Sequence, residues 1–164
     1  LAGVKDLPIL IVIEDNGYST YADKSVRVAK NREIEKLVEG LGLNFLSGNG
    51  DDVTEVAQVS KIAIEKVRNN VPFVLQFQTF RRYEHCGPNI DDSLGYRSKS
   101  ELNSYEERVP LEVLRRKILS DSMTKSQELV SIDMAVSRYV LGVYQEALRD
   151  IENSISTVRQ SSQT

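Results

Sequence analysis

The chain has 164 residues, 40% hydrophobic and 27% charged, with a formal net charge of −3. This composition is typical of a folded domain with a buried core, and the acidic balance disfavours nucleic-acid binding, because phosphate binding needs a basic surface. The longest apolar run, residues 7–13, is too short to span a bilayer, so no membrane segment is expected. The single cysteine rules out an internal disulfide and fits a reducing compartment, which predicts a cytoplasmic location.

The first half of the sequence alternates between helix-like and strand-like segments. Residues 1–6 resemble the end of a helix, and the apolar, β-branched run over 7–13 predicts a strand covered on both faces. Asn31 is placed to cap a helix that ends near Gly40, with Gly42 beyond its end.

A second strand, a turn, a helix and a third strand follow in order. The strand is predicted over 43–46, and Asp51 or Asp52 is expected to cap a helix over 53–68, whose apolar residues recur at helical spacing. The third strand is predicted over 72–77. The alternation predicts an α/β fold with a mostly parallel sheet, flanking helices and further helices at the C-terminal end.

The second half of the sequence changes character at residue 81. Residues 81–108 are polar and show no period, so we expect a long functional loop that completes an α/β part over 1–108. Pro110 is suited to the first position of a helix, and a longer amphipathic helix follows. We expect the helices over 109–153 to pack on the α/β part and residues 154–164 to form a frayed tail.

Polar clusters follow two of the predicted strands, at residues 14–19 and 79–85. Because ligands gather at the carboxyl ends of parallel strands, both clusters are expected on one edge of the sheet. The Asn16 amide oxygen is a hard ligand suited to Mg²⁺, and Arg81 is suited to a phosphate. His85 suits proton transfer or a phosphate contact. The residues also allow a plain Asp-Asn-Gly turn, a solvated arginine and a surface histidine.

Five short motifs, taken together in this order, resemble one known family. Glu14-Asp15-Asn16-Gly17-Tyr18 is similar to the end of a thiamine diphosphate motif that begins Gly-Asp-Gly. The later motifs are Thr79-Phe80-Arg81, His85, Asp91-Asp92 with Gly95-Tyr96-Arg97, and Pro110-Leu111. Over residues 7 to about 150, the chain resembles the alpha subunit of the decarboxylating component of 2-oxo acid and acetoin dehydrogenase complexes.

The resemblance implies specific roles for four residues. Asn16 would ligate Mg²⁺ through its side chain and Tyr18 through its backbone carbonyl. Arg81 would hold the diphosphate of thiamine diphosphate, and His85 would lie beside it as a catalytic residue. The implied reaction is oxidative decarboxylation of a 2-oxo acid or cleavage of an acetoin-like substrate.

The resemblance also implies an oligomer with other proteins. A beta subunit or domain would supply the carboxylate that activates the cofactor, and an acyltransferase component is a further expected partner. The Gly-Asp-Gly start of the motif would lie ahead of Leu1, so we expect this chain alone to bind the cofactor weakly. Tyr83 stands where many members have histidine, which leaves the substrate open, and Cys86 replaces a serine that is phosphorylated in some members. The rival interpretation is a non-catalytic α/β interaction module that binds a partner through its long C-terminal helix.

Overall fold

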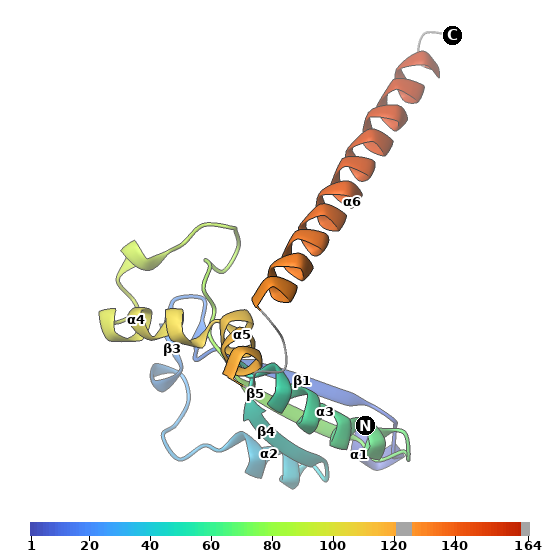
Figure 1. Cartoon of the computed structure of the whole chain (residues 1–164). Helices are drawn as coiled ribbons and strands as arrows, with labels where there is room; N and C mark the ends of the chain where they lie inside the picture. Colours follow the sequence, from blue (N-terminus) through green and yellow to red (C-terminus); the bar gives the residue numbers. More distant parts are fainter. Residues whose placement is uncertain (121–125, 162–164) are drawn as a thin grey trace. The chain divides into compact units, whose positions relative to one another are not determined.

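The computed structural model describes residues 1–120 and 126–161 and divides into two units, Leu1–Arg116 and Lys117–Thr164 (Figure 1). The first unit contains the sheet, its helices and the polar loop, and the second contains the long C-terminal helix. Within the described ranges, no helix is long and apolar enough to cross a membrane.

The first unit is built on three parallel strands: β1 (Leu10–Asp15), β4 (Asn44–Asn49) and β5 (Phe73–Gln78). Their order in the sheet is β1-β5-β4, so the last strand in sequence lies in the centre. The register pairs Asp15 with Gln78 and Asn49 with Gln78, which aligns the carboxyl ends of all three strands. The predicted α/β fold with a parallel sheet is confirmed.

The core lies between the central strand and α3 (Val53–Val67). Phe73, Leu75 and Phe77 alternate along β5 and pack with Ala63 of α3, whose small side chain allows close approach. The strand covered on both faces is therefore β5. Among the described residues β1 is an outer strand, and its Ile11 and Val12 are 42% and 49% exposed, so these residues alone do not cover it on both faces as predicted.

Two short helices flank the strands ahead of α3. α1 (Ala2–Lys5) precedes β1, as predicted, and α2 (Ile34–Gly40) lies against β4. Asn31 does not cap α2, because the helix begins later, after an extended Glu33 that makes no capping hydrogen bond through its side chain. Gly42 has the expected left-handed backbone just beyond the helix end, with a φ of 74°.

A small hairpin that the sequence pattern did not predict follows β1. β2 (Tyr18–Ser19) pairs with β3 (Ala22–Asp23), and a short 3₁₀ helix, η1 (Lys24–Val26), comes next. Thr20 lies in the turn between the two strands with a φ of 57°, an unfavourable conformation for a β-branched residue. The hairpin holds this strained backbone at the carboxyl end of the sheet.

Three helical segments follow β5 within or at the end of the first unit: η2 (Asp92–Leu94), α4 (Lys99–Arg108) and α5 (Pro110–Ser120). The predicted loop is thus irregular only up to Ser98, whose side chain accepts a hydrogen bond from the Glu101 amide and caps α4. Polar residues dominate α4, so its sequence shows no strong apolar period. α5 begins at Pro110, as predicted.

The second unit is dominated by α6 (Ser126–Ser161). The backbone is helical up to Ser161, and residues 162–164 lie outside the described part of the chain. That residues 154–164 form a frayed tail stays a prediction. That the helices over 109–153 pack on the α/β part stays a prediction. Within the unit itself, the following apolar side chains of α6 are exposed: Val130, Ile132, Met134, Val136, Tyr139, Val140, Leu141, Val143, Tyr144, Leu148, Ile151 and Ile155.

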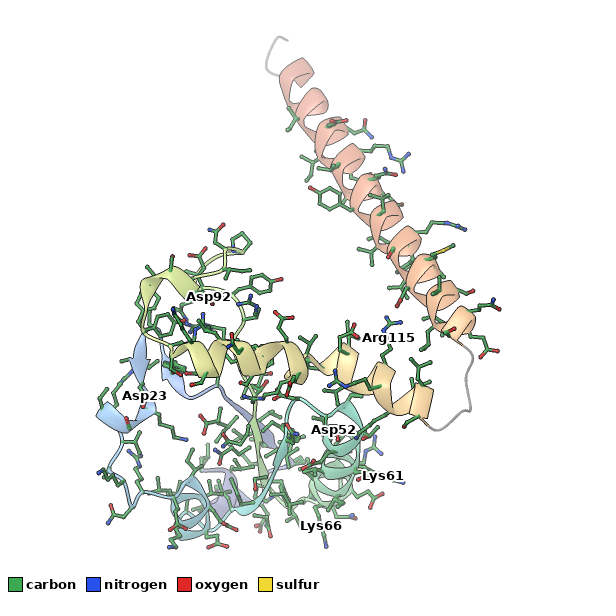
Figure 2. The ribbon with its side chains drawn as sticks, turned by 60° about the vertical axis from the view of Figure 1, so that its left-hand side comes forward. Asp23, Asp52, Lys61, Lys66, Asp92 and Arg115 are labelled. Atoms are coloured by element: carbon green, nitrogen blue, oxygen red, sulfur yellow. The ribbon has the colours of Figure 1, made fainter. Side chains whose placement is uncertain are left out.

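The two aspartates before α3 have different roles. Asp52 caps the helix by accepting a 3.0 Å hydrogen bond from the Thr54 amide, and Figure 2 shows it at the helix start. Asp51 is buried, and one of its oxygens lies 2.7 Å from both Nε and Nη2 of Arg108 at the end of α4. Its other oxygen accepts from the Thr79 hydroxyl at 3.0 Å. Asp51 therefore ties α4 to the edge of the sheet.

Replacing Asp51 by alanine is expected to lower the free energy of unfolding by about 2–3 kcal/mol, because charge-assisted hydrogen bonds to a buried carboxylate are lost. Arg108 is partly exposed, and access to water limits the loss. The matched variant Asp52→Ala removes a helix cap and should cost about 1 kcal/mol. Urea unfolding followed by circular dichroism measures both variants. Equal losses would contradict the special role of Asp51.

Candidate functional site

The two polar clusters predicted at strand ends meet on one edge of the sheet. The Thr79 amide donates a 3.1 Å hydrogen bond to the Asp15 carbonyl, which joins the ends of β5 and β1. Beyond this point, Nη2 of Arg81 donates to the Thr20 carbonyl in the β2–β3 hairpin at 2.8 Å. The prediction that both clusters lie on the same edge is confirmed.

Asn16 lies in a tight turn between β1 and the hairpin. Its Oδ1 accepts a 2.9 Å hydrogen bond from the Tyr18 amide, and Asp15 Oδ1 accepts one from the Gly17 amide at 3.2 Å. The turn interpretation and the metal interpretation are compatible, because an amide oxygen has a second lone pair that a cation can use. Among the described residues, no three His, Cys, Asp or Glu side chains are grouped to hold a metal ion. The predicted ligands, an amide oxygen and a backbone carbonyl, are of another type.

Asp15 supports this turn from the side of the sheet. Its Oδ2 forms an ion pair with Lys24 and accepts hydrogen bonds from the side-chain amides of Gln76 at 2.7 Å and Gln78 at 3.2 Å. Burial alone would raise the pKa of Asp15, but hydrogen bonds from Lys24, Gly17 and Gln78 and the charge of Lys24 together hold the pKa below its ordinary value. The carboxylate therefore stays charged and fixes the start of the turn.

Arg81 is held in place by its neighbours through two of its three nitrogens. Nε donates to the Tyr83 carbonyl at 3.0 Å, and Nη2 donates to the Thr20 carbonyl and to the Tyr96 hydroxyl at 3.1 Å. The Asp91 carboxylate lies 3.8 Å from Nη2. In the described part of the chain, no hydrogen bond uses Nη1, so this end of the fixed guanidinium keeps two N–H donors.

A buried ion pair orders the loop that follows Arg81. Arg97 and Asp91 pair with side chains only 2% and 3% exposed, and Arg97 Nη1 also donates to the Arg81 carbonyl at 2.5 Å. The Tyr96 hydroxyl donates to Asp91 at 2.8 Å. A second pair, Arg82 with Asp92, is about one-third exposed, and Figure 2 shows Asp92 in the loop. The loop is therefore fixed at both ends of the segment between Arg81 and Asp91.

His85 lies in that segment and is exposed. Among the described residues it makes no hydrogen bond or ion pair with Asn16, Tyr18 or Arg81. The structure thus brings Arg81 to Thr20, in the hairpin that begins at Tyr18, and places His85 on the loop that follows Arg81. The role predicted for His85 stays a prediction.

Glu101, which the sequence did not single out, joins α4 to the hairpin. Its two oxygens accept hydrogen bonds from the Tyr18 hydroxyl at 2.7 Å and the Tyr105 hydroxyl at 2.9 Å. The Tyr105 ring stacks on Phe80 with ring centroids 4.4 Å apart. The Tyr96 ring lies edge-on to Tyr18 at 5.3 Å. Glu101 is 83 residues from Tyr18 in sequence, so no local pattern reveals the contact.

The buried Tyr105 hydroxyl predicts a loss of stability at alkaline pH. Burial, together with the hydrogen bond to Glu101, raises the pKa of Tyr105 above its ordinary value of 10.0, although Arg97 acts in the opposite direction. The folded state thus favours the neutral phenol. Its contribution is fully present below about pH 10 and is lost as the pH rises through the higher pKa of the folded protein.

We therefore expect the urea midpoint to fall more steeply for the unchanged protein than for Tyr105→Phe as the pH rises above about 10. The substitution keeps the ring that stacks on Phe80 and removes only the titrating group. Identical pH dependence in the two proteins would show that Tyr105 does not contribute.

A cationic cavity of about 340 Å³ opens beside the Asn16–Tyr18 turn. Its walls include Gly17 and Tyr18, the carboxylate of Asp15 and three basic side chains, those of Lys24, Arg27 and Arg32, of which Lys24 pairs with Asp15. Arg81 is not one of the lining residues. The sequence analysis did not select these three residues, because basic residues scattered over nine positions form no recognisable motif. An anion near the turn would be stabilised by their charge.

The sequence matches the model of one protein family, the dehydrogenase E1 component, over residues 1–156. The chain belongs to this family. Similar proteins include the pyruvate dehydrogenase E1 component subunit alpha of Rickettsia felis, 32% identical over 94% of this chain and 45% of that protein. The subunit of the same name from Zymomonas mobilis is 28% identical over 85% of this chain and 39% of that protein.

A testis-specific, mitochondrial form of the E1 alpha subunit from Rattus norvegicus is 28% identical over 89% of this chain and 37% of that protein. The chain spans less than half the length of these relatives. The E1 match covers the sheet, the ordered loop and nearly all of α6. The family resemblance predicted from five short motifs is therefore confirmed.

Proposed function

We propose that this chain supplies part of the thiamine diphosphate and Mg²⁺ site of an E1 alpha subunit that acts on a 2-oxo acid or an acetoin-like substrate. One observation carries the proposal. The Arg81 guanidinium after β5 donates to the Thr20 carbonyl in the hairpin that follows Asn16, so the predicted phosphate contact and the predicted metal turn share one edge of the sheet. The family match across residues 1–156 favours this enzyme over a non-catalytic interaction module.

The donors present fit the cofactor. Asn16 Oδ1 and the Tyr18 carbonyl are the hard oxygen ligands that Mg²⁺ prefers, and Mg²⁺ commonly bridges protein oxygens to phosphate oxygens. Arg81 is held by its neighbours in a way that leaves Nη1 for a phosphate oxygen. When bound, thiamine diphosphate supplies the carbanion chemistry of the reaction. The chain's own residues hold the cofactor, neutralise its charge and place His85 near it.

The proposed assembly includes other proteins. A beta subunit would supply the carboxylate that activates the cofactor, and an acyltransferase component would accept the product group. The three relatives are named as alpha subunits, which supports a hetero-oligomer.

The proposal is tested by titrating the assembled enzyme with thiamine diphosphate, with and without Mg²⁺. Asn16→Ala should weaken Mg²⁺-dependent binding at least about tenfold, equivalent to about 1.4 kcal/mol, because a metal ligand is lost. Asn16→Asp keeps an oxygen in the turn and should retain most of the affinity. Asn31→Ala, at an exposed asparagine, is the control. Binding that is insensitive to both Mg²⁺ and Asn16→Ala would reject the proposal.

A further inference from the structure

The loop between Arg81 and Asp91 contains a second, smaller closed structure around His85. The Glu84 amide donates a 2.9 Å hydrogen bond to the Asn89 carbonyl, which closes the backbone. The Glu84 side chain then turns back over the same turn. Its Oε1 accepts from the Asn89 amide at 3.3 Å and from the Asn89 side-chain Nδ2 at 2.7 Å. We call residues 84–89, closed by these three bonds, the Glu84 clamp.

Gly87 leaves room for the present position of the Glu84 side chain. A Cβ atom at this position would lie 2.1 Å from Glu84 Oε1 and 2.9 Å from its carboxyl carbon. The carboxylate therefore crosses the turn in space that only glycine leaves open. A side chain at position 87 and the present position of Glu84 exclude each other.

The clamp is anchored on both sides. Before it, Arg81 Nε holds the Tyr83 carbonyl at 3.0 Å. After it, Asp91 forms the buried pair with Arg97. The exposed His85 and Cys86 thus lie on a short closed turn between two fixed points, adjacent in sequence to the proposed phosphate contact.

We infer that Glu84 is a positioning residue for His85: its carboxylate, lying over Gly87 and bonded to Asn89, holds the turn on which His85 lies, shortly after Arg81 in sequence. The inference rests on the proposed function for the role of His85. The clamp itself is defined by hydrogen bonds within this chain and does not depend on the proposed function. Glu84 acts here as a hydrogen-bond acceptor, so its shape matters more than its charge.

Cys86, the single cysteine, provides a site-specific probe of the clamp. A nitroxide spin label on Cys86 of the chain should give a broad, slow-motion spectrum in the unsubstituted protein. Glu84→Ala and Gly87→Ala should both give a narrower, fast-motion spectrum, because they remove the carboxylate or its space. Glu84→Gln keeps the acceptor oxygen and should retain the slow spectrum. Equal mobility in the unsubstituted protein and Glu84→Ala would overturn the clamp.

A single and a double variant test whether the side chains of Glu84 and Asn89 pair directly. Asn89→Asp places a second carboxylate against Glu84 and should free the label. The double variant Glu84→Gln with Asn89→Asp restores a donor and an acceptor with their positions exchanged, and it should recover the slow spectrum. Failure of the double variant to recover would count against direct pairing of these two side chains.

Kinetics of the assembled enzyme test whether Glu84 positions His85 for the reaction. Glu84→Ala should lower kcat about tenfold, because the clamp orients His85. The affinity for thiamine diphosphate should stay within about twofold, because the side-chain hydrogen bonds of Glu84 go to Asn89 and not to Arg81 or Asn16. Glu84→Gln should stay close to the unsubstituted enzyme. A mobile label with unchanged kcat would overturn the positioning role. If the proposed function is wrong, the unsubstituted enzyme will not bind thiamine diphosphate. The spin-label experiment would still show whether the Glu84 clamp exists.

Discussion

Replacing Arg97 by methionine is expected to destabilise residues 1–116 by about 3–5 kcal/mol, because it leaves the buried Asp91 carboxylate without its main partner. The side chains of both residues are almost fully buried, so water cannot replace the lost interaction. The Tyr96 hydroxyl remains at 2.8 Å and Arg81 at 3.8 Å, which favours the lower end of that range. Urea unfolding gives the loss of free energy.

The neighbouring pair is a matched control for this prediction. Arg82 and Asp92 are in the same loop and pair at 2.9 Å, but their side chains are 30% and 32% exposed. Arg82→Met should therefore cost about 1 kcal/mol or less. The double variant Arg97→Met with Asp91→Leu should recover part of the loss, since apolar residues of similar size often replace buried pairs well. Similar losses for Arg97→Met and Arg82→Met would show that burial of the pair is not decisive.

Hydrogen exchange separates two ways in which the stability could fall. If the ion pair holds the loop alone, Arg97→Met should speed exchange of amides over residues 81–98 and leave β5 protected. If the pair also supports the sheet edge through the bond to the Arg81 carbonyl, amides near the end of β5 should exchange faster as well. The structure predicts the second pattern, because Arg97 contacts the backbone only three residues after β5 ends.

Replacing Arg81 by methionine in the assembled enzyme is expected to weaken binding of thiamine diphosphate at least about thirtyfold, equivalent to about 2 kcal/mol. The physical reason is the loss of a fixed guanidinium whose Nη1 makes no hydrogen bond to the described residues. Isothermal titration with thiamine diphosphate, and separately with thiamine, measures the effect. Thiamine lacks the diphosphate, so its affinity should change little.

Affinities for the two ligands distinguish loss of the phosphate contact from a general disturbance of the protein. Arg81 also holds the Thr20 and Tyr83 carbonyls, so its removal disturbs the protein as well as the phosphate contact. A general disturbance would weaken thiamine and thiamine diphosphate equally and would contradict the assigned role. Arg81→Lys keeps the charge but loses the planar fork, so it should give an intermediate affinity. Arg82→Met serves again as the control.

Much of the candidate site was predictable because it depends on local rules. A polar cluster directly after a parallel strand lies at a known edge of the sheet, and this placed Asn16 and Arg81 together before any contact was known. The Asp52 cap and the Pro110 helix start follow from backbone hydrogen bonding and a fixed φ, which are properties of single residues.

Other parts of the site depend on partners far apart in the chain. Asp51 and Asp52 are equal candidates for a cap in sequence, and the distant partners Arg108 and Thr79, which both bond Asp51, distinguish them. The α4 helix was not predicted from the sequence pattern, because it is mostly polar and buries mainly Tyr105. Glu101 accepts a hydrogen bond from Tyr18 only because α4 lies beside the hairpin that carries Tyr18.

The sequence by itself determined the class of fold, the order of the three sheet strands and of the helices between them, the edge of the sheet that carries the site and the family. These follow from periodicity, capping and short motifs, which act over a few residues. The tertiary structure decided that β5 is the central, fully buried strand, that Arg97 and Asp91 order the loop, and that Glu84 closes the turn around His85. Burial and the pairing of charges are properties of space around a residue, and that space forms only when distant segments pack together.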